Sequence, residues 1–249
     1  MAKLNSLLKI EGTLDGLTFY KKDGAYFVRT KGGVSKSRIA NDPAFARTRE
    51  NGSEFGHSAT SGKMLRRALN PVISDAKDNR VALRLTAVMS KVKNADTSSA
   101  RGERQVSIGI QTPEGKNELK SFNFNKNAIL QSILKIPVNL NTTTGEVSMP
   151  SFIPIQDVVY PQGTTHLSFS MHVLQLDFST GNYQLESSTV LNLPISNSNT
   201  PVIVQPSAVP SGSGQNYYLL KLEFFQEING LQYQLNNGAY NATQILEVI

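Results

Sequence analysis

The chain has 249 residues and a mass of 27.2 kDa, which is enough for one large or two modest domains without covalent cross-links. It contains no cysteine, so disulfides, thiolate metal sites and cysteine nucleophiles are excluded. The net charge of +6 is uneven, because residues 1–104 hold 20 Lys and Arg against 10 Asp and Glu, whereas residues 105–249 hold 5 against 9. This asymmetry favours either a basic face for a polyanion or two surfaces that meet head to tail in an assembly.

The amino-terminal stretch MAKLNSLLKIEG is interrupted by Lys and polar residues, so it lacks the apolar core of a secretory signal. No run reaches the roughly 18 apolar residues of a membrane span. We therefore expect a soluble, cytoplasmic protein with no membrane span. If the protein is part of a larger particle, it would be released with that particle.

Two Asp-Gly pairs, Asp15-Gly16 and Asp23-Gly24, separate the short β-prone runs KIEGTL, LTFYKK and AYFVRT. Asp-Gly favours a type I′ turn, in which both central residues need a positive φ. The pattern predicts a three-stranded meander from about Leu8 to Thr30. Both of its faces are partly apolar, and three strands alone are marginal in water. We expect helices that follow in the chain, or a neighbouring chain, to cover it.

The stretch NDPAFARTRENGSEFG predicts a helix that Asn41 caps and in which Pro43 occupies the first turn. One side of this helix carries a thin stripe in which glycine interrupts the apolar residues. The stripe consists of Phe45, Thr48, Gly52, Phe55 and Ala59. Each interior glycine costs about 0.5–1 kcal/mol relative to alanine, so close backbone approach is expected to compensate. Either the helix lies against the meander, or it breaks near residues 56–62, or the stripe is an intersubunit contact.

A second helix is predicted after Ser74 and Asp75, with Asp78 in its first turn and an apolar face made by Val81, Leu85, Val88 and Val92. From about Arg104 the hydrophobic period changes to two. Seven segments then predict strands: QVSIGIQ, HLSFSMHVLQLDF, YQLESSTVLNL, PVIVQ, YYLLKLEFFQEI, LQYQL and TQILEVI.

These elements predict a mainly β protein with a helical insert (α+β), in which a β-meander and two helices precede an antiparallel, immunoglobulin-like β-sandwich. We expect residues 1–103 to form the basic meander and helices, and residues 104–249 to form the sandwich. In HLSFSMHV, Leu167, Phe169, Met171 and Val173 should face the core, and His166, Ser168, Ser170 and His172 should face water. Asn229-Gly230 predicts one more hairpin, Ser196 to Asn216 predicts a long loop with one short strand, and the apolar chain end ILEVI should be paired.

Chemical motifs are missing from the sequence. His166 and His172 lie six residues apart on one predicted strand, too far to share a metal, and His57 has no neighbouring ligands. Phosphate-loop, dinucleotide, nucleophile-elbow and zinc-protease motifs do not occur. The sequence therefore predicts no catalytic residue, no cofactor, no metal and no small-molecule substrate.

The basic residues of the first third are the more serious functional candidates. They surround Tyr20, Tyr26 and Phe27, and clustered cations beside aromatic rings are typical of nucleic-acid binding. The ten acidic residues among residues 1–104 dilute them and no nucleic-acid motif matches, so a solvated face and an interface with an acidic partner are the alternatives. The nucleic-acid hypothesis would use Arg47, Arg49, Arg66, Arg67 and Arg84.

Three stretches together resemble a family of uncharacterised proteins from Bacteroidota genomes: GTLDGLTFYKKDGAYFVRTKGG, DPAFARTRENGSEFG and EFFQEINGLQYQLNNGAYNATQILEV. The resemblance covers both ends, roughly half the chain. It implies a basic hairpin and helix front end with a β-sandwich back end, and it brings no catalytic residues. The chain resembles, more loosely, a neighbouring Bacteroidota family with a Gly-rich amino-terminal hairpin and a β-sandwich tail.

Two hypotheses follow. The first is a non-enzymatic structural protein that self-associates or decorates a larger particle, such as a filament, a sheath or a phage-like virion. In it, the interface residues are Phe45, Gly52, Phe55 and Gly56, with the glycines admitting a close partner. The alternative is a nucleic-acid-binding accessory protein that uses the basic amino-terminal region.

Overall fold

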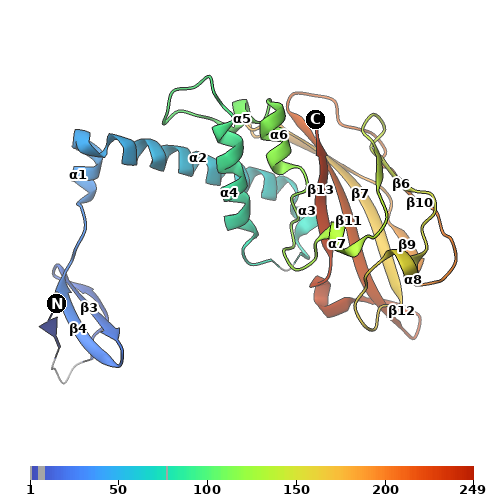
Figure 1. The fold of residues 1–249 in the computed structure, drawn as a ribbon, viewed down its shortest axis with the longest axis horizontal. Coiled ribbons are helices and arrows are strands. Elements are labelled where there is room, and N and C mark those ends of the chain that lie inside the picture. The colour runs from blue at the N-terminus through green and yellow to red at the C-terminus, as the bar shows by residue number, and fades with distance from the viewer. Residues whose placement is uncertain (1, 5–8, 77) are drawn as a thin grey trace. The chain divides into compact units, whose positions relative to one another are not determined.

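The computed structural model describes residues 2–4, 9–76 and 78–249. The chain forms two compact units, Met1–Arg49 and Glu50–Ile249. Residues 103 and 104, between which we expected a domain boundary, both lie within the second unit. Each unit is described separately below (Figure 1).

The first unit contains a four-stranded antiparallel sheet with the order β1-β4-β3-β2. Its strands are β1 (Ala2–Lys3), β2 (Gly12–Leu14), β3 (Leu17–Lys22) and β4 (Ala25–Thr30). Asp15 and Gly16 have φ values of 45° and 77°, and Asp23 and Gly24 have 50° and 78°. The two Asp-Gly turns and the three-stranded meander are therefore confirmed, although its first strand begins at Gly12, and Leu8, the expected start, lies outside the described residues. The fourth strand, β1, was not predicted.

Two short helical segments follow, α1 (Lys36–Asn41) and η1 (Pro43–Phe45). Asp42 between them is extended, with ψ at 126°, because the ring of the following proline disfavours helical geometry there. Its side chain accepts a hydrogen bond from the Ala44 amide at 2.9 Å. The predicted cap Asn41 is thus wrong: it is the last residue of α1, and Asp42 provides the cap.

Helix α2 runs unbroken over Ala46–Ala68, so the predicted break near residues 56–62 is wrong. Its buried face was not expected and consists of Glu54, Ser58, Ser61, Gly62, Leu65 and Ala68. The hydroxyls of Ser58 and Ser61 bond to carbonyls one turn back, at 2.9 and 3.1 Å, which allows these polar side chains to be buried. The apolar spacing therefore identified the wrong face of this helix.

The remaining helices belong to the second unit. They are α3 (Asn70–Ile73), α4 (Val81–Asn94), α5 (Val106–Gly109), α6 (Pro113–Leu119), α7 (Leu130–Ile133) and α8 (Pro154–Asp157). Helix α4 confirms the second predicted helix, but its predicted start is wrong: the helix begins at Val81, so Asp78 lies before its first turn. The strand predicted for QVSIGIQ is wrong, because Val106 and Ile110 lie four residues apart and are buried on the same side of α5.

Two antiparallel sheets form the carboxy-terminal sandwich. The larger consists of β7 (His166–Leu176), β8 (Tyr183–Ser187), β9 (Leu191–Pro194), β11 (Gln215–Ile228), β12 (Leu231–Gln234) and β13 (Ala242–Val248). The smaller has the order β10-β6-β5 and consists of β5 (Asn139–Asn141), β6 (Glu146–Met149) and β10 (Val202–Val204). A short helix, η2 (Leu235–Gly238), follows β12.

The long strands β7 and β11 form the centre of the larger sheet, beside β13 in Figure 1. Strands β8 and β9 pair with successive parts of β7, and β12 and β13 with successive parts of β11. The β11–β12 hairpin turns at Asn229-Gly230, and the chain end is paired as β13, as predicted. The expected loop is present with β10 inside it, but it ends before Gln215, where β11 begins, rather than at Asn216.

Hydrophobic cores lie on both faces of the larger sheet. Leu167, Phe169, Met171 and Val173 of β7 pack in one core with β6 and β10 of the smaller sheet, which confirms the sandwich. On the opposite face, residues of α2, α4, α5 and α6 pack with Leu174 and Leu176 of β7. The second unit is therefore layered as helices, a large sheet and a small sheet.

The prediction that the second face of β7 is wet is wrong for Ser168, Ser170 and His172, which are buried. His166 is only partly exposed. The cause is tertiary, because the helices pack on this face of the sheet. Ser170 and Ser168 lie opposite Lys221 and Glu223 of β11, and Asp75, which follows α3, pairs with that Lys221.

Candidate functional site

The amino-terminal sheet has two chemically distinct faces, which the strand register defines. Tyr20 lies opposite Phe27, and Phe19 lies opposite Val28. Directly paired residues of antiparallel strands project to the same side. The "aromatic-basic face" consists of Lys3, Thr13, Thr18, Tyr20, Lys22, Ala25, Phe27 and Arg29. The "apolar face" consists of Ala2, Gly12, Leu14, Leu17, Phe19, Lys21, Tyr26, Val28 and Thr30.

Cations lie over aromatic rings on both faces. On the aromatic-basic face, the Tyr20 and Phe27 rings stack with centroids 5.8 Å apart, and the Arg29 guanidinium lies 5.3 Å from the Tyr20 centroid. On the apolar face, the ammonium groups of Lys9 and Lys21 lie 4.9 and 5.7 Å from the centre of Tyr26. These distances are within the range of cation–π attraction.

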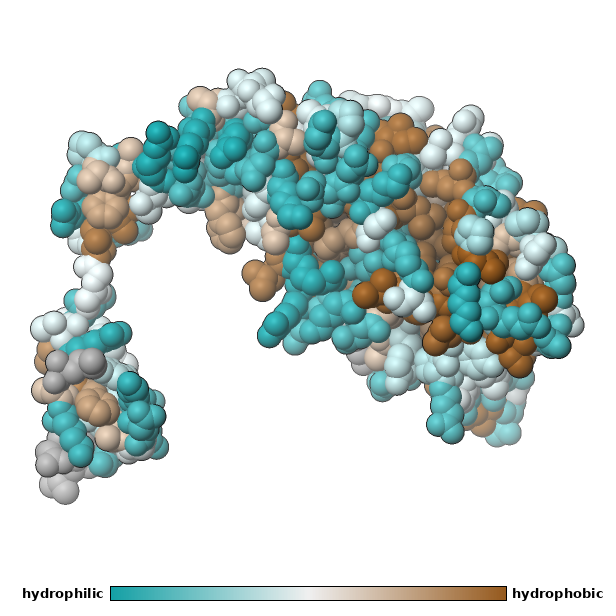
Figure 2. Space-filling view, viewed as in Figure 1, coloured by the Kyte–Doolittle hydropathy of each residue, from teal (hydrophilic) through white to brown (hydrophobic). Residues whose placement is uncertain are grey.

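No described residue of the first unit is buried. Leu14 is 59% exposed and Leu17 is 38% exposed, both on the apolar face. On the visible side of this unit, hydrophobic side chains gather between hydrophilic ones (Figure 2). The sheet thus presents apolar side chains with no dry core of its own among the described residues.

The four predicted interface residues are all accessible. Phe45 is partly exposed, with the Arg38 guanidinium 5.7 Å from its ring centre. Phe55 is 60% exposed, and a Cβ added at Gly52 or Gly56 would meet no described atom within 4 Å. The close approach expected at these glycines is therefore not made by the described residues of this chain.

The structure does not bring the five predicted arginines together. Arg47 and Arg49 lie in the first turn of α2, Arg66 and Arg67 in its last turn, and Arg84 on α4. Two of them have structural roles. Arg49 donates to the carbonyls of Ile39 and Asp42, at 2.7 and 3.0 Å, and Arg84 donates to Asp78 and to the Asn123 carbonyl, at 2.6 and 2.7 Å.

A buried ionic cluster lies at the amino-terminal part of the second unit. Glu54, 4% exposed, accepts hydrogen bonds from Arg104 at 2.8 and 2.9 Å, from the Gly102 amide at 2.8 Å, and from Lys93. The Arg104 guanidinium and the other donors, acting against burial, lower the pKa of Glu54 to about 2. His57 accepts from the Val106 amide at 3.0 Å, and burial lowers its pKa. All these groups satisfy one another, which indicates a structural role.

A second polar cluster crosses the larger sheet. Lys221 lies 2.9 Å from Asp75 and 3.2 Å from Glu223, and Asn241 donates to both carboxylates, at 3.1 and 3.3 Å. Burial and the neighbouring Asp75 raise the pKa of Glu223. Among the described residues, five buried side-chain oxygens have no hydrogen-bond partner, and three of them lie at this cluster: Asp75 Oδ1, Ser168 Oγ and Thr243 Oγ1.

His172 lies on the same face of the sheet as this cluster. Its ring nitrogens contact the hydroxyls of Ser170 and Ser187, at 3.0 and 2.8 Å. Burial, with a smaller effect of the Lys221 charge, lowers its pKa to about 4. The imidazole is therefore neutral at neutral pH and serves as a hydrogen-bonding group.

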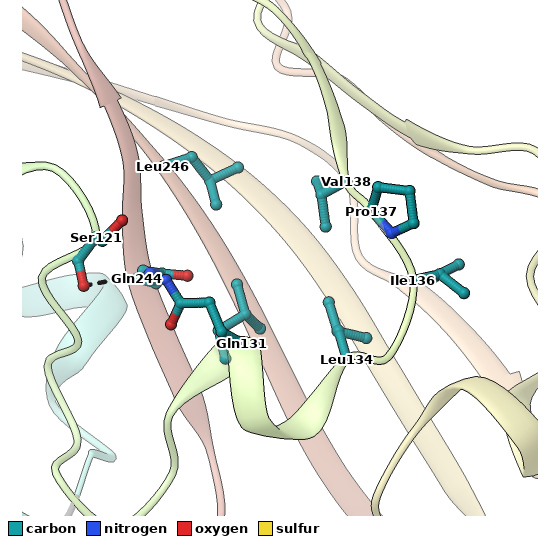
Figure 3. Close-up of a pocket in the computed structure, with 9 residues that line it drawn as sticks. Ser121, Gln131, Leu134, Ile136, Pro137, Val138, Gln244 and Leu246 are labelled. Carbon is teal, nitrogen blue, oxygen red and sulfur yellow. Dashed lines mark hydrogen bonds between the residues drawn. The ribbon is translucent and has the colours of Figure 1, made fainter.

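A cavity of about 250 Å³ lies beside β13, between that strand and the segment that follows α7 (Figure 3). Leu134, Val138 and Leu246 give it an apolar lining, and Gln244 donates to the Ser121 carbonyl at 3.2 Å on its polar side. No titratable side chain lines it. The cavity can accept an apolar group but offers no acid or base for chemistry.

Over residues 2–4, 9–76 and 78–249, no cluster of three or more His, Asp or Glu side chains could hold a metal ion. Among the described helices, none combines the length and hydrophobicity needed to cross a bilayer. Comparison of the chain with protein-family models, curated proteins and solved structures gave no match.

Sequence reasoning missed both ionic clusters and did not assign the basic residues to the two sheet faces. A signal for one cluster was present, since Lys221 and Glu223 are charged residues two apart within an otherwise apolar strand. For the sheet, the register follows from the two Asp-Gly turns, so its faces could have been listed residue by residue.

Proposed function

We propose that this chain is a non-enzymatic structural protein that associates with further copies of itself in a larger particle, and that the apolar face is one of its contacts. The observation that carries the proposal is the lack of any buried residue among the described residues of the first unit. Full burial of one Leu or Val side chain contributes about 1.5–3 kcal/mol. A sheet of this size is marginal without such burial, so a covering surface would stabilise it.

Charge does not support the head-to-tail contact that the sequence suggested. Divided at the unit boundary, residues 1–49 hold 10 Lys and Arg against 4 Asp and Glu, and residues 50–249 hold 15 of each. The first unit thus carries the entire net charge and the second is neutral. The proposed contact therefore rests on apolar side chains.

The exposed stripe of α2 is a second proposed contact. Gly52, Phe55 and Gly56 lie on one side of the helix, and open space surrounds both glycines. The glycines lack side chains, so a partner backbone can approach the helix closely there, and Phe55 can pack against that partner. The chain keeps two residues here that cost helix stability, which a close partner would compensate.

The test compares Leu17→Glu with Thr18→Glu in the full chain. The two residues are neighbours on β3 but project to the apolar and aromatic-basic faces, respectively. Light scattering over a range of protein concentrations, with negative-stain images, should show assemblies for the unaltered chain and for Thr18→Glu, and their loss in Leu17→Glu. A monomer at all concentrations would refute the proposal, and equal behaviour of the two variants would refute the assignment to the apolar face.

A second variant, Gly52→Leu, tests the α2 contact. Leucine is a better helix former than glycine, and the position is open, so the second unit should remain folded in a thermal unfolding measurement. Assembly should nevertheless be lost, because the side chain blocks close approach. Unchanged assembly would remove the α2 stripe from the proposed contacts.

A further inference from the structure

The aromatic-basic face combines stacked rings with cations around them. Lys3 lies opposite Phe27 in the register, and Lys22 follows Tyr20 by two residues on the same side of β3. Arg29 lies over the Tyr20 ring, which itself stacks on Phe27. Three cationic side chains thus border one aromatic pair.

No strand residue that the structure places on this face is acidic, and none is a large aliphatic residue. The two aspartates of the meander, Asp15 and Asp23, lie in turns. The face also belongs to the unit that carries the whole net charge of the chain. Its charge is therefore complementary to a polyanion, and unlike the apolar face it carries no exposed leucine or valine.

We propose that the aromatic-basic face binds single-stranded nucleic acid. Phosphates would pair with Lys3, Lys22 and Arg29, and unpaired bases would stack on the aromatic pair. A duplex offers phosphates but keeps its base faces stacked, so it can use only the cations. An acidic protein surface would likewise match the charge and leave the rings without a planar partner. The combination of rings and cations is what selects an unpaired strand.

This site differs from the set of five arginines predicted from the sequence. Those residues lie on two helices, and two of them bond to groups within their own unit. The residues of the new site lie on adjacent strands about 4.8 Å apart, a spacing at which neighbouring side chains can contact the same nucleotides.

The experiment measures binding of a fluorescently labelled 20-nucleotide oligothymidylate to the full chain by anisotropy, at several salt concentrations. Three phosphate contacts predict a log–log salt slope of about −2 for a single strand. Lys22→Glu should weaken binding at least tenfold. Lys21→Glu is the matched control, since it makes the same charge change at the neighbouring residue on the opposite face.

Stacking is tested with Phe27→Leu, for which at least about a fivefold loss is expected, and with Phe19→Leu on the opposite face as its control. Amide NMR spectra of residues 12–30 verify that each variant keeps the hairpins. If Phe27→Leu loses them, the comparison of binding by Lys22→Glu and Lys21→Glu decides whether this face binds the oligonucleotide. Absence of binding at low salt, or equal losses in Lys21→Glu and Lys22→Glu, would overturn the proposal.

Competition separates the other polyanions. A duplex of equal length or polyglutamate that competes as well as the oligonucleotide would also overturn the proposal, because the rings would then contribute nothing. The result is independent of assembly: Leu17→Glu should still bind the oligonucleotide, and Lys22→Glu should still assemble. Failure of one proposal is thus distinguishable from failure of the other.

Discussion

Arg104 donates through Nε and Nη2 to both carboxylate oxygens of Glu54, at 2.8 and 2.9 Å, although 50 residues separate the two. Through this pair, the loop that follows α4 is attached to the middle of α2. Lys93, 6% exposed, bonds to the same carboxylate. Three elements of the second unit therefore depend on one buried negative charge.

Replacing Glu54 with Gln should destabilise the second unit by about 3–5 kcal/mol, because Lys93 and Arg104 are left without their counter-charge. Urea unfolding measures the free energy. Glu118→Gln is the matched control: Glu118 pairs with Lys91 at 3.1 Å at the surface, where the same change should cost less than about 1 kcal/mol. Similar losses in the two variants would contradict the structural role of the Glu54 cluster.

Mild acid should destabilise the fold through His172. Its pKa is lowered from 6.5 to about 4 by burial, so below pH 6.5 the unfolded chain binds a proton that the folded chain does not. The free energy of unfolding should therefore fall as the pH decreases from 6.5 to 4, by up to about 3 kcal/mol.

The measurement compares urea unfolding of the unaltered chain and of His172→Asn between pH 7 and 4. The variant should lose this part of the pH dependence. His57, whose pKa burial also lowers, contributes to both proteins and cancels in the comparison. Identical slopes would show that His172 is protonated as readily in the folded state as in the unfolded one.

Local signals predicted the two ends of the chain well. The Asp-Gly turns, the β11–β12 hairpin and the paired chain end depend on backbone preferences and alternation, which neighbouring residues determine. The strand prediction for the region around α5 was wrong because Val106 and Ile110 fit both a strand alternation and a four-residue helical spacing. Only the packing of α5 on α4 distinguishes the two.

The candidate sites depended on tertiary structure to different degrees. The burial of Ser168 and His172 results from elements distant in sequence that pack on this face of the larger sheet, so no local pattern could reveal it. The five arginines looked like one cluster because they are close in sequence, yet they occupy different helices and turns. The two faces of the amino-terminal sheet, in contrast, follow from local turns and alternation alone.

Removal of the Lys221 charge should destabilise the second unit, because it leaves the buried Glu223 and the partly buried Asp75 without their counter-charge. Lys221→Met should cost about 3–5 kcal/mol at pH 7, because Asp75 and Glu223 lose their common counter-charge. Without the ammonium, protonation of the carboxylates is favoured in the folded state, so the loss should shrink as the pH falls from 7 to 5. Urea unfolding at both pH values measures the loss.

The double variant Lys221→Met, Asp75→Asn is the control for this effect. It removes one of the unpaired carboxylates, so it should recover part of the stability that Lys221→Met loses at pH 7. A loss independent of pH, with no recovery in the double variant, would indicate that Lys221 contributes by packing rather than by charge.

Two helical glycines, Gly56 and Gly109, should respond oppositely to alanine. A Cβ at Gly56 meets no described atom, whereas one at Gly109 would overlap the Val92 carbonyl oxygen of α4. Gly56→Ala should therefore stabilise the second unit by about 0.5–1 kcal/mol, and Gly109→Ala should destabilise it by about 1–3 kcal/mol or more. Urea unfolding of the two variants, which make the same chemical change, checks both signs.

Assembly measurements on Gly56→Ala then decide whether its glycine serves a partner. No described residue fills the space beside Gly56. The helix stability lost through this glycine is therefore compensated only if another molecule packs there. The variant should therefore be more stable as a monomer and weaker in assembly, with a higher concentration needed for the light-scattering increase. A gain in stability with unaltered assembly would mean that Gly56 has no role in the contact.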